Sequence, residues 1–359
     1  MLKPRRAVET LPEYHPPLGG RAGLRCDFNE NTLGCSPRVM QKLKSLGPED
    51  LARYPERESV EATVAGHFNL QPEEILLTNG VDEAIHLLCE TFLEPGDEVL
   101  IPVPTFAMYE LFAAATGARI KKVPAQPDFQ FPMQDLLNQI SLRTKLIAIA
   151  NPNNPTGAVA PPDALLTLAE AAPQAAFLVD EAYFEFYGSS LLGAWRDQPN
   201  IFVTRTFSKA YGLAGLRIGI LAGTPTALAH VRRVASPYSV NNVALACLPD
   251  ALTDTAFVNN YASEVCAQRD RLQMQLATWG IRNWPSQANF VLFEVGQDQA
   301  RFVHGLRTRG ILVRDRSRDP GCDGCVRVTL GVAAQTDLLV RAMGEVFAEL
   351  GRISRESLP

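Results

Sequence analysis

The chain has 359 residues, of which 46% are hydrophobic and 20% charged, a composition typical of globular proteins and unlike that of disordered or fibrous chains. Its formal net charge of −5 and its isoelectric point near 5.7 provide no basic surface of the kind that binds nucleic acid or anionic membranes. We therefore expect a small-molecule ligand, and neither a nucleic-acid partner nor a membrane.

The lack of a recognisable targeting segment and the pattern of cysteines favour a cytoplasmic location. No stretch approaches the roughly twenty apolar residues of a membrane span, and no apolar signal-peptide core follows the basic residues near the N-terminus. The seven cysteines are odd in number and scattered, unlike a disulfide framework. Cys322 and Cys325 form a C-x-x-C pair, but the residues between them, Asp323-Gly324, are typical of a turn. Because no second Cys or His pair lies nearby, we expect no metal site.

Short apolar runs alternate with amphipathic segments through the middle of the chain, the pattern of parallel strands joined by helices. The expected strands, in chain order, are residues 75–78, 98–102, 146–150, 176–180, 201–206 and 216–222, with helices that include 82–92 and 163–172. Right-handed crossovers would stack them into an α/β fold with a mostly parallel, doubly wound sheet. Its ligand crevice would lie at the carboxyl ends of the strands.

The pattern changes after about residue 250. A long helix is expected at 256–279, strands at 289–294, 311–314 and 326–330, and a closing helix at 336–350. These elements predict a smaller α+β domain. We expect a large domain at residues 41–250 and a small domain made of residues 1–40 and 251–359.

The most informative segment surrounds Lys209. Thr206 and Ser208 offer hydroxyl groups, a glycine-rich stretch lets the backbone approach an anion, and Arg217 supplies a guanidinium. A lone lysine would more simply be a solvated loop cation. With these neighbours the segment indicates a phosphate site beside an amine, which suits covalent carbonyl chemistry.

Three further motifs lie at expected strand ends. Gly80, Val81 and Asp82 lead from a strand into a helix, whose first backbone N–H groups could bind phosphate, although such joints are common. Asp180 ends a buried strand, where a carboxylate needs a cation such as a protonated ring nitrogen, or else caps the next loop. The Asn-Pro-rich loop 151–157 is either a simple turn or a rigid support for an asparagine side chain.

These motifs together resemble fold-type I PLP-dependent enzymes (PLP, pyridoxal 5'-phosphate) of the aspartate aminotransferase superfamily, and within it the histidinol-phosphate aminotransferase family. The shared order of motifs is far more specific than any one of them. The matching segments are Asn29–Asn31 with Gly34, Arg53–Pro55, Gly80–Ile85, Pro104–Phe106 with Tyr109, Asn151–Gly157, Asp180–Tyr183, Thr206–Gly219, Gln287–Phe290, Val313–Asp315 and Gly324–Thr329.

The resemblance implies PLP as the cofactor and Lys209 as the lysine that forms a Schiff base with it and moves the proton during catalysis. Asp180 would hold the ring nitrogen, while Asn154 and Tyr183 would hold the 3'-oxygen. Phe106 would stack on the ring, where the family usually has tyrosine. The residues implied for the cofactor's phosphate are Gly80, Val81, Asp82, Thr206, Ser208 and Arg217.

A homodimer is also implied, because Tyr54 matches a tyrosine that reaches the cofactor of the partner subunit. The residues implied for the substrate are Arg327, Arg314, Tyr14 and Asn29. This chain departs from the family pattern at Phe28 and Thr32, in the loop that would cover the substrate.

The implied activity is transfer of an amino group between histidinol phosphate or an aromatic amino acid and a 2-oxo acid, with 2-oxoglutarate as the expected acceptor. An aromatic residue at position 28 would favour an aromatic donor. One alternative is therefore an aromatic amino acid aminotransferase without activity on histidinol phosphate. A PLP-dependent decarboxylase of the threonine-phosphate type is a second alternative, because the bond that breaks depends on substrate orientation. A non-enzymatic sensor module is disfavoured, since the chain has no basic stripe for DNA.

Overall fold

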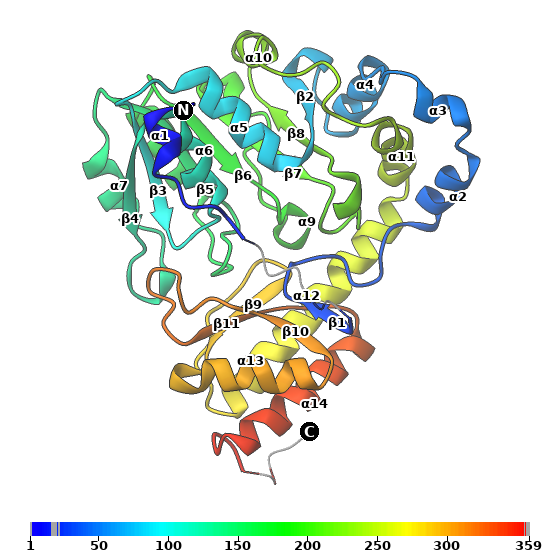
Figure 1. The fold of residues 1–359 in the computed structure, drawn as a ribbon, viewed down its shortest axis with the longest axis vertical. Coiled ribbons are helices and arrows are strands. Elements are labelled where there is room, and N and C mark those ends of the chain that lie inside the picture. Colours follow the sequence, from blue (N-terminus) through cyan, green and yellow to red (C-terminus); the bar gives the residue numbers. More distant parts are fainter. Residues whose placement is uncertain (1, 16–19, 21, 355, 357–359) are drawn as a thin grey trace.

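Two β-sheets organise the chain (Figure 1). The structure is a computed structural model that describes residues 2–15, 20, 22–354 and 356. The larger sheet has seven strands in the order β2-β8-β7-β6-β5-β3-β4. Their bounds are β2 Ile75–Thr78, β3 Glu98–Val103, β4 Arg119–Pro124, β5 Thr144–Ala150, β6 Ala176–Asp180, β7 Ile201–Thr206 and β8 Gly219–Ala222.

The expected mostly parallel, doubly wound sheet is confirmed. Every neighbouring pair is parallel except those of β8, which runs antiparallel to β2 and to β7. The central strands β6 and β7 are buried along their whole length, as their continuous apolar runs predict for a sheet covered on both faces. One face packs against α5 (Gly80–Phe92), α6 (Met108–Thr116) and α10 (Pro225–Arg232). The other packs against α7 (Met133–Gln139), α8 (Pro162–Ala171) and α11 (Asn242–Thr253).

The smaller sheet has the order β1-β10-β11-β9. Its strands are β1 Leu24–Cys26, β9 Phe290–Glu294, β10 Ile311–Asp315 and β11 Cys325–Thr329, and only the β1–β10 pair is parallel. Val326 and Val328 face the core shared with the helices α12 (Thr255–Thr278), α13 (Gln299–Thr308) and α14 (Ala333–Glu349). Since side chains alternate along a strand, Arg327 and Thr329 lie on the opposite face. Figure 1 shows α12 running from the larger lobe down to this sheet.

The remaining helices are short and include α1 (Arg6–Glu9), α2 (Pro37–Ser45), α3 (Pro48–Ala52), α4 (Glu58–His67) and α9 (Phe184–Tyr187). Helix α1 contacts α6, whereas β1 pairs with β10. The N-terminal segment therefore contacts both the larger lobe, through α6, and the smaller sheet, through β10. The domain bounds at residues 40 and 250 stay predictions.

Two details differ from the sequence expectation. The strand expected from residue 216 begins only at Gly219, because residues 214–216 form a 3₁₀ turn and Arg217 adopts a left-handed backbone with φ of 53°. Strand β4 was not expected, since its sequence RIKKVP is largely polar. It is an edge strand, where lysines discourage pairing with another chain.

Candidate active site

The functional side chains predicted from the sequence gather where the two sheets face each other. Asn151 and Asp180 lie at the carboxyl ends of β5 and β6, and Lys209 follows β7 by three residues. Arg327 approaches from the smaller sheet and bonds to Asn154 of the larger lobe. This is the edge at which ligands bind in doubly wound folds.

Lys209 has the environment of a reactive amine. Its Nζ donates a hydrogen bond of 3.1 Å to the backbone oxygen of Phe28 and lies 6.0 Å from the ring centre of Tyr183. Burial, with a contribution from the positive charge of Arg327, lowers the pKa of Lys209 from 10.5 to about 8. A substantial fraction of the amine is therefore neutral and nucleophilic at mildly alkaline pH.

Asp180 is only 4% exposed, and both of its oxygens accept hydrogen bonds from neutral donors. Its Oδ2 accepts a hydrogen bond of 2.6 Å from the hydroxyl of Tyr109, and its Oδ1 accepts one of 3.0 Å from the backbone N–H of Ala182. Burial raises the pKa of Asp180 to about 6, although the bond from Tyr109 counteracts this. A cation placed against this carboxylate would stabilise its charged form.

Tyr183 and Asn29 are brought together from opposite ends of the chain. Asn29 Nδ2 donates to the Tyr183 hydroxyl at 2.8 Å, and the backbone N–H of Asn29 donates to Thr329 Oγ1 at 3.0 Å. The Tyr183 ring meets Phe290 edge-on at 5.1 Å between centres. These contacts connect the end of β6 to the smaller sheet. Asn154 joins the same group through its bond from Arg327.

Arg217, Gly80 and Asp82 form a second group at the start of α5. Arg217 Nη2 donates to Asp82 Oδ2 at 3.1 Å. Gly80 has φ of 73°, a backbone conformation that favours glycine, and a Cβ there would lie 2.6 Å from Arg217 Nη2 and would displace this guanidinium from the helix start. Nearby, Thr206 Oγ1 accepts a bond of 3.1 Å from the backbone N–H of Ser208.

The backbone of Gly80 and Val81 begins α5, where unpaired N–H groups and the helix dipole favour an anion. The residues present thus fit a phosphate-bearing carbonyl cofactor: an amine, a buried carboxylate and a cationic cradle at a helix start. This fit rests on the glycine position that a Cβ would fill.

The other predicted residues lie around this centre. Phe106 is half-buried and meets Tyr109 edge-on at 5.8 Å. Arg314 Nη2 donates to the Tyr14 hydroxyl at 3.4 Å, and its guanidinium lies 5.2 Å from the ring centre of Phe28. The Tyr54 side chain is 77% exposed in the single subunit.

The chain matches the family model of class I and II aminotransferases over residues 25–343. It belongs to that family. A histidinol-phosphate aminotransferase of Moorella thermoacetica is 32% identical over 355 residues, which span 97% of this chain and 91% of that protein. One of Roseiflexus castenholzii is 36% identical over 335 residues, covering 90% and 89% of the two chains.

Solved structures agree with this assignment. The histidinol-phosphate aminotransferase of Sinorhizobium meliloti, determined in complex with PLP, superposes with a TM-score of 0.88 at 26% identity, covering 98% of this chain and 99% of that one. The present chain is therefore a PLP-dependent aminotransferase of fold type I. When bound, PLP withdraws electrons from the substrate carbon that gains or loses a proton.

The side chains of this aminotransferase supply the groups that hold the cofactor and carry the proton. Lys209 is the amine suited to bond the cofactor and to carry a proton, and Asp180 is the carboxylate suited to a protonated ring nitrogen. Two important partners were not assigned roles from the sequence. Tyr109 was noted only as part of a motif, yet it orients Asp180. Arg316 was not singled out, yet it lies just beyond the end of β10, where its positive charge helps to lower the pKa of Arg327.

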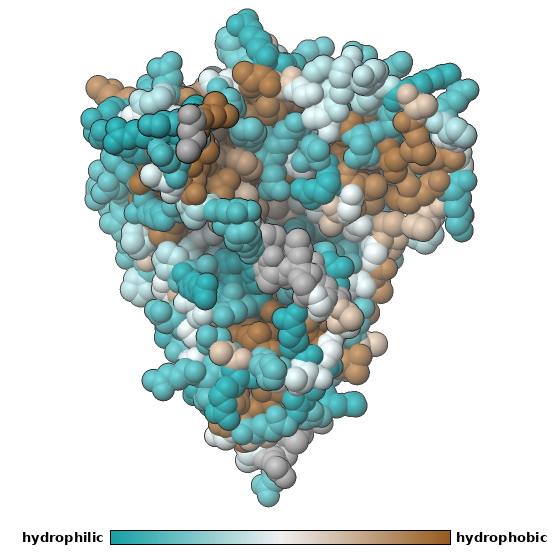
Figure 2. Space-filling model, viewed as in Figure 1, coloured by the Kyte–Doolittle hydropathy of each residue, from teal (hydrophilic) through white to brown (hydrophobic). Residues whose placement is uncertain are grey.

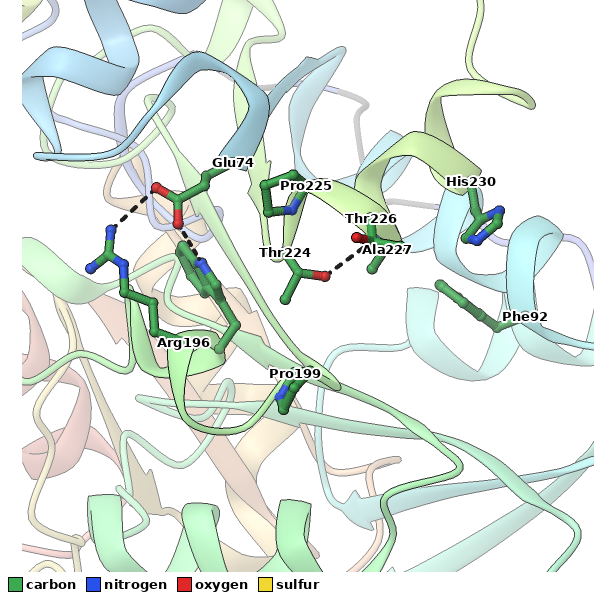
Figure 3. A pocket seen from close by; sticks show the side chains of 10 residues that line it. Glu74, Phe92, Arg196, Pro199, Thr224, Pro225, Thr226, Ala227 and His230 are labelled. Carbon is green, nitrogen blue, oxygen red and sulfur yellow. Dashed lines mark hydrogen bonds and ion pairs between the residues drawn. The ribbon is translucent and has the colours of Figure 1, made fainter.

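A cavity of about 650 Å³ lies elsewhere, where β8 ends and α10 begins (Figure 3). Glu74 accepts bonds from Trp195 and Arg196 at its rim. Because β8 runs antiparallel to β7, its carboxyl end lies at the edge of the sheet opposite to Asp180. This cavity shares no residue with the candidate active site.

Cys322 and Cys325 are buried free thiols that form the ends of a turn, with the N–H of Cys325 bonded to the oxygen of Cys322 at 2.9 Å. The turn expected from Asp323-Gly324 is thus present, and Gly324 has the positive φ of 67° that it requires. Among the described residues, no helix is both long and apolar enough to cross a membrane.

Proposed function

We propose that this aminotransferase moves the amino group of histidinol phosphate to a 2-oxo acid, with 2-oxoglutarate as the acceptor. The observation that supports it best is the pair Arg314 and Arg327, which lie directly opposite each other on β10 and β11. Both face the lobe that carries Lys209. Two guanidinium groups suit a dianionic phosphate better than a single carboxylate. The names of the relatives from Moorella and Roseiflexus agree with this substrate.

For the cofactor, we propose Lys209 as the bonding lysine, Asp180 as the partner of the ring nitrogen, and Asn154 with Tyr183 as partners of the 3'-oxygen. Phe106 would cover one face of the ring. The phosphate group would lie against Gly80, Val81, Asp82, Thr206, Ser208 and Arg217. The contact of Arg217 with Gly80 and Asp82 supports this cradle.

For the substrate, we propose Arg327 and Arg314 as the principal anion partners, with Tyr14 and Asn29 assisting. Arg327 is 4% exposed, and its Nη2 donates to the Asp27 backbone oxygen at 2.7 Å. Burial, together with the neighbouring Arg316, lowers the pKa of Arg327 to about 9. A bound anion would offset the cost of keeping this guanidinium charged.

Replacing Arg314 by alanine tests the substrate. The variant is expected to lose about tenfold to a hundredfold in kcat/KM for histidinol phosphate, the value of one charge-assisted contact of about 1.5–3 kcal/mol. The loss for phenylalanine should be smaller, because it offers the arginines a single carboxylate in place of a dianionic phosphate. Single-turnover conversion of the cofactor by each donor measures both values. A wild-type enzyme that uses phenylalanine but ignores histidinol phosphate would refute the proposed donor.

An aromatic amino acid donor is the second candidate, and Phe28 is the observation that favours it. The Phe28 ring contacts the Arg314 guanidinium, so this ring also stabilises the position of that arginine. Decarboxylation is the remaining alternative. Incubating the PLP form with single donors, without acceptor, separates these reactions: transamination yields the pyridoxamine form, whereas a decarboxylase releases carbon dioxide.

We also propose a homodimer in which Tyr54 reaches the partner's cofactor. Large apolar side chains gather on one side of the larger lobe, around α2, α3 and α11, at the upper right of Figure 2. Exposed residues of this part of the chain are Met40 in α2, Leu51 in α3 and Tyr54 just after α3. Tyr54 and Tyr238 contact each other there, with 4.6 Å between ring centres. An apolar surface of this kind is typical of a subunit interface.

Replacing Tyr54 by phenylalanine is expected to weaken PLP affinity by roughly 1.5–3 kcal/mol, since one charge-assisted hydrogen bond is lost. Tyr238→Phe is the matched control, because it removes a hydroxyl from the same surface. Cofactor titration monitored by absorbance measures both variants. In mixed dimers of Tyr54→Phe and Lys209→Ala subunits, a tyrosine acting across the interface leaves one site intact. Full activity in a monomer by sedimentation would contradict the dimer.

A cytoplasmic location stays a prediction. All seven cysteines are free thiols in the structure, which supports a reducing compartment.

A further inference from the structure

A buried ion pair joins the two loops that carry Tyr183 and Lys209. Glu181 directly follows β6, and its backbone N–H donates to the oxygen of Thr204 in β7 at 2.9 Å. Arg205 is the next residue of β7, and it donates from Nε and Nη2 to Glu181 Oε2 at 3.0 and 2.9 Å. The side chains are 4% exposed for Arg205 and 1% for Glu181. The pair therefore links the ends of two neighbouring strands at the carboxyl edge of the larger sheet.

Glu181 also closes the loop that contains Tyr183. Its Oε1 accepts a hydrogen bond of 2.7 Å from the backbone N–H of Leu191, and its Oε2 accepts one of 2.6 Å from the Ser190 hydroxyl. Arg205 donates to the oxygen of the same hydroxyl at 2.8 Å. The two ends of the segment 181–191 are thus held together at one carboxylate.

Arg205 contacts the middle of that segment through an aromatic ring. Its guanidinium carbon lies 3.4 Å from the ring centre of Phe184, the residue next to Tyr183, and 5.3 Å from that of Phe68. A planar guanidinium can stack on a ring and bind a carboxylate at the same time. Lys209 follows Arg205 by four residues, and its Nζ lies 6.0 Å from the Tyr183 ring centre. Arg205 is therefore connected to both sides of the active centre.

Three titratable groups surround the Arg205 guanidinium. Burial raises the pKa of Glu181 and, to about 7, that of Glu185 in α9, while the charge of Arg205 opposes both rises. Burial and the charge of Arg205 lower the pKa of His67 in α4. Glu185 Oε2 has no hydrogen-bond partner within the described part of the chain. Glu181 is thus the carboxylate that is placed to compensate the charge of Arg205.

We propose that Glu181 and Arg205 are positioning residues for proton transfer at Lys209, because together they fix Tyr183 relative to the Lys209 amine. This inference rests on the roles proposed above for Lys209 and Tyr183. A hydroxyl that donates to the 3'-oxygen of the cofactor weakens the hold of that oxygen on the proton of the Lys209 nitrogen. When the pair is broken, Tyr183 loses its fixed place, and that proton stays bound up to a higher pH.

Glu181→Gln tests the proposal, because it removes the charge and keeps the shape. In the PLP-loaded protein, the pH midpoint of the near-visible absorbance is expected to rise by about half a pH unit or more, toward the value for Tyr183→Phe. The single-turnover rate should fall about tenfold while KM for the donor stays within about twofold, since a displaced reacting group slows chemistry more than binding.

Two milder variants keep the test decisive should Glu181→Gln fold poorly. Arg205→Lys retains the cation, but a compact ammonium cannot contact Glu181, Ser190 and Phe184 together, so a shift in the same direction is expected. Ser190→Ala removes a hydroxyl that both members of the pair share, from a residue that is itself exposed, and should give a smaller shift.

Glu98→Gln is the matched control for a purely structural role. The Glu98 side chain is 2% exposed and forms ion pairs with Lys121 and Arg143. It begins β3, at the edge of the sheet opposite to Asp180, which ends β6. Both substitutions of glutamate by glutamine should lower the melting temperature of the PLP-free protein, but only Glu181→Gln should shift the absorbance midpoint.

The outcomes separate the positioning role from the assignments on which it rests. A shifted midpoint in Tyr183→Phe with none in Glu181→Gln, Arg205→Lys and Ser190→Ala would overturn the positioning role alone. Equal shifts in Glu98→Gln and Glu181→Gln would also overturn it, because lost stability would then be the cause. An unchanged midpoint in Tyr183→Phe would refute the role proposed for Tyr183, and with it the action of the pair through that residue.

Discussion

Replacing Lys209 by alanine is expected to abolish turnover and to remove the near-visible absorbance of the PLP-loaded protein. Lys209 is the amine with a lowered pKa of about 8, beside the candidate cradle formed by Arg217 and Gly80. Without it, neither covalent attachment nor proton transfer remains, and proton transfer alone contributes roughly 10²–10⁴-fold to a rate. Absorbance spectra and single-turnover rates measure the two losses separately.

Lys122→Ala is the control, since Lys122 is an exposed residue of the edge strand β4 that pairs with Glu110. Borohydride reduction of the wild-type protein followed by peptide mass spectrometry locates the cofactor directly. An adduct on any lysine other than Lys209 would contradict the assignment of Lys209 as the cofactor-binding lysine, whatever the activity of the variant.

Replacing Asp180 by asparagine is expected to leave PLP bound but to slow proton transfer by at least about a hundredfold, a barrier increase of about 3 kcal/mol or more. Asparagine preserves the shape, and its one acceptor oxygen can keep the bond from the backbone N–H of Ala182, while its Nδ2 would donate to the Tyr109 hydroxyl in place of the bond that Asp180 accepts. The substitution therefore removes the negative charge with little change of volume. A neutral partner no longer favours the protonated ring nitrogen, and the electron-withdrawing power of the ring falls accordingly.

The measurement is the single-turnover rate of the Asp180→Asn protein at full cofactor occupancy, with Asp163→Asn as the control on the exposed surface of α8. Near-normal turnover in a fully loaded Asp180→Asn protein would contradict the role proposed for the carboxylate. A loss that disappears on adding excess PLP would show that Asp180 serves affinity instead of chemistry.

Much of the larger sheet could be predicted from the sequence. The strands β2, β6 and β7 have the bounds that their apolar runs predicted, because a strand buried on both faces needs a continuous apolar run and ends where polar residues begin. The mostly parallel order followed from the helices between the strands. Strand β4 escaped prediction because an edge strand can be polar along its length.

The cofactor residues were also predictable as a set, since each lies within a short motif at a strand end. Lys209, Arg217 and Gly80 were recognised from neighbours only a few residues away. Local sequence could not show that Arg217 rests on Gly80, residues 137 positions apart, nor that a Cβ at position 80 would collide with it.

The sequence by itself determined the alternation of strands and helices, the strand-end positions of Lys209 and Asp180, and the membership of these motifs in one family, because each depends on residues adjacent in the chain. Only the tertiary structure decided which distant side chains meet. Tyr109 reaches Asp180, Asn29 reaches Tyr183, and Arg314 lies opposite Arg327. Those contacts depend on strand register and on how the two sheets pack, which are set by burial across the whole molecule and leave no local pattern.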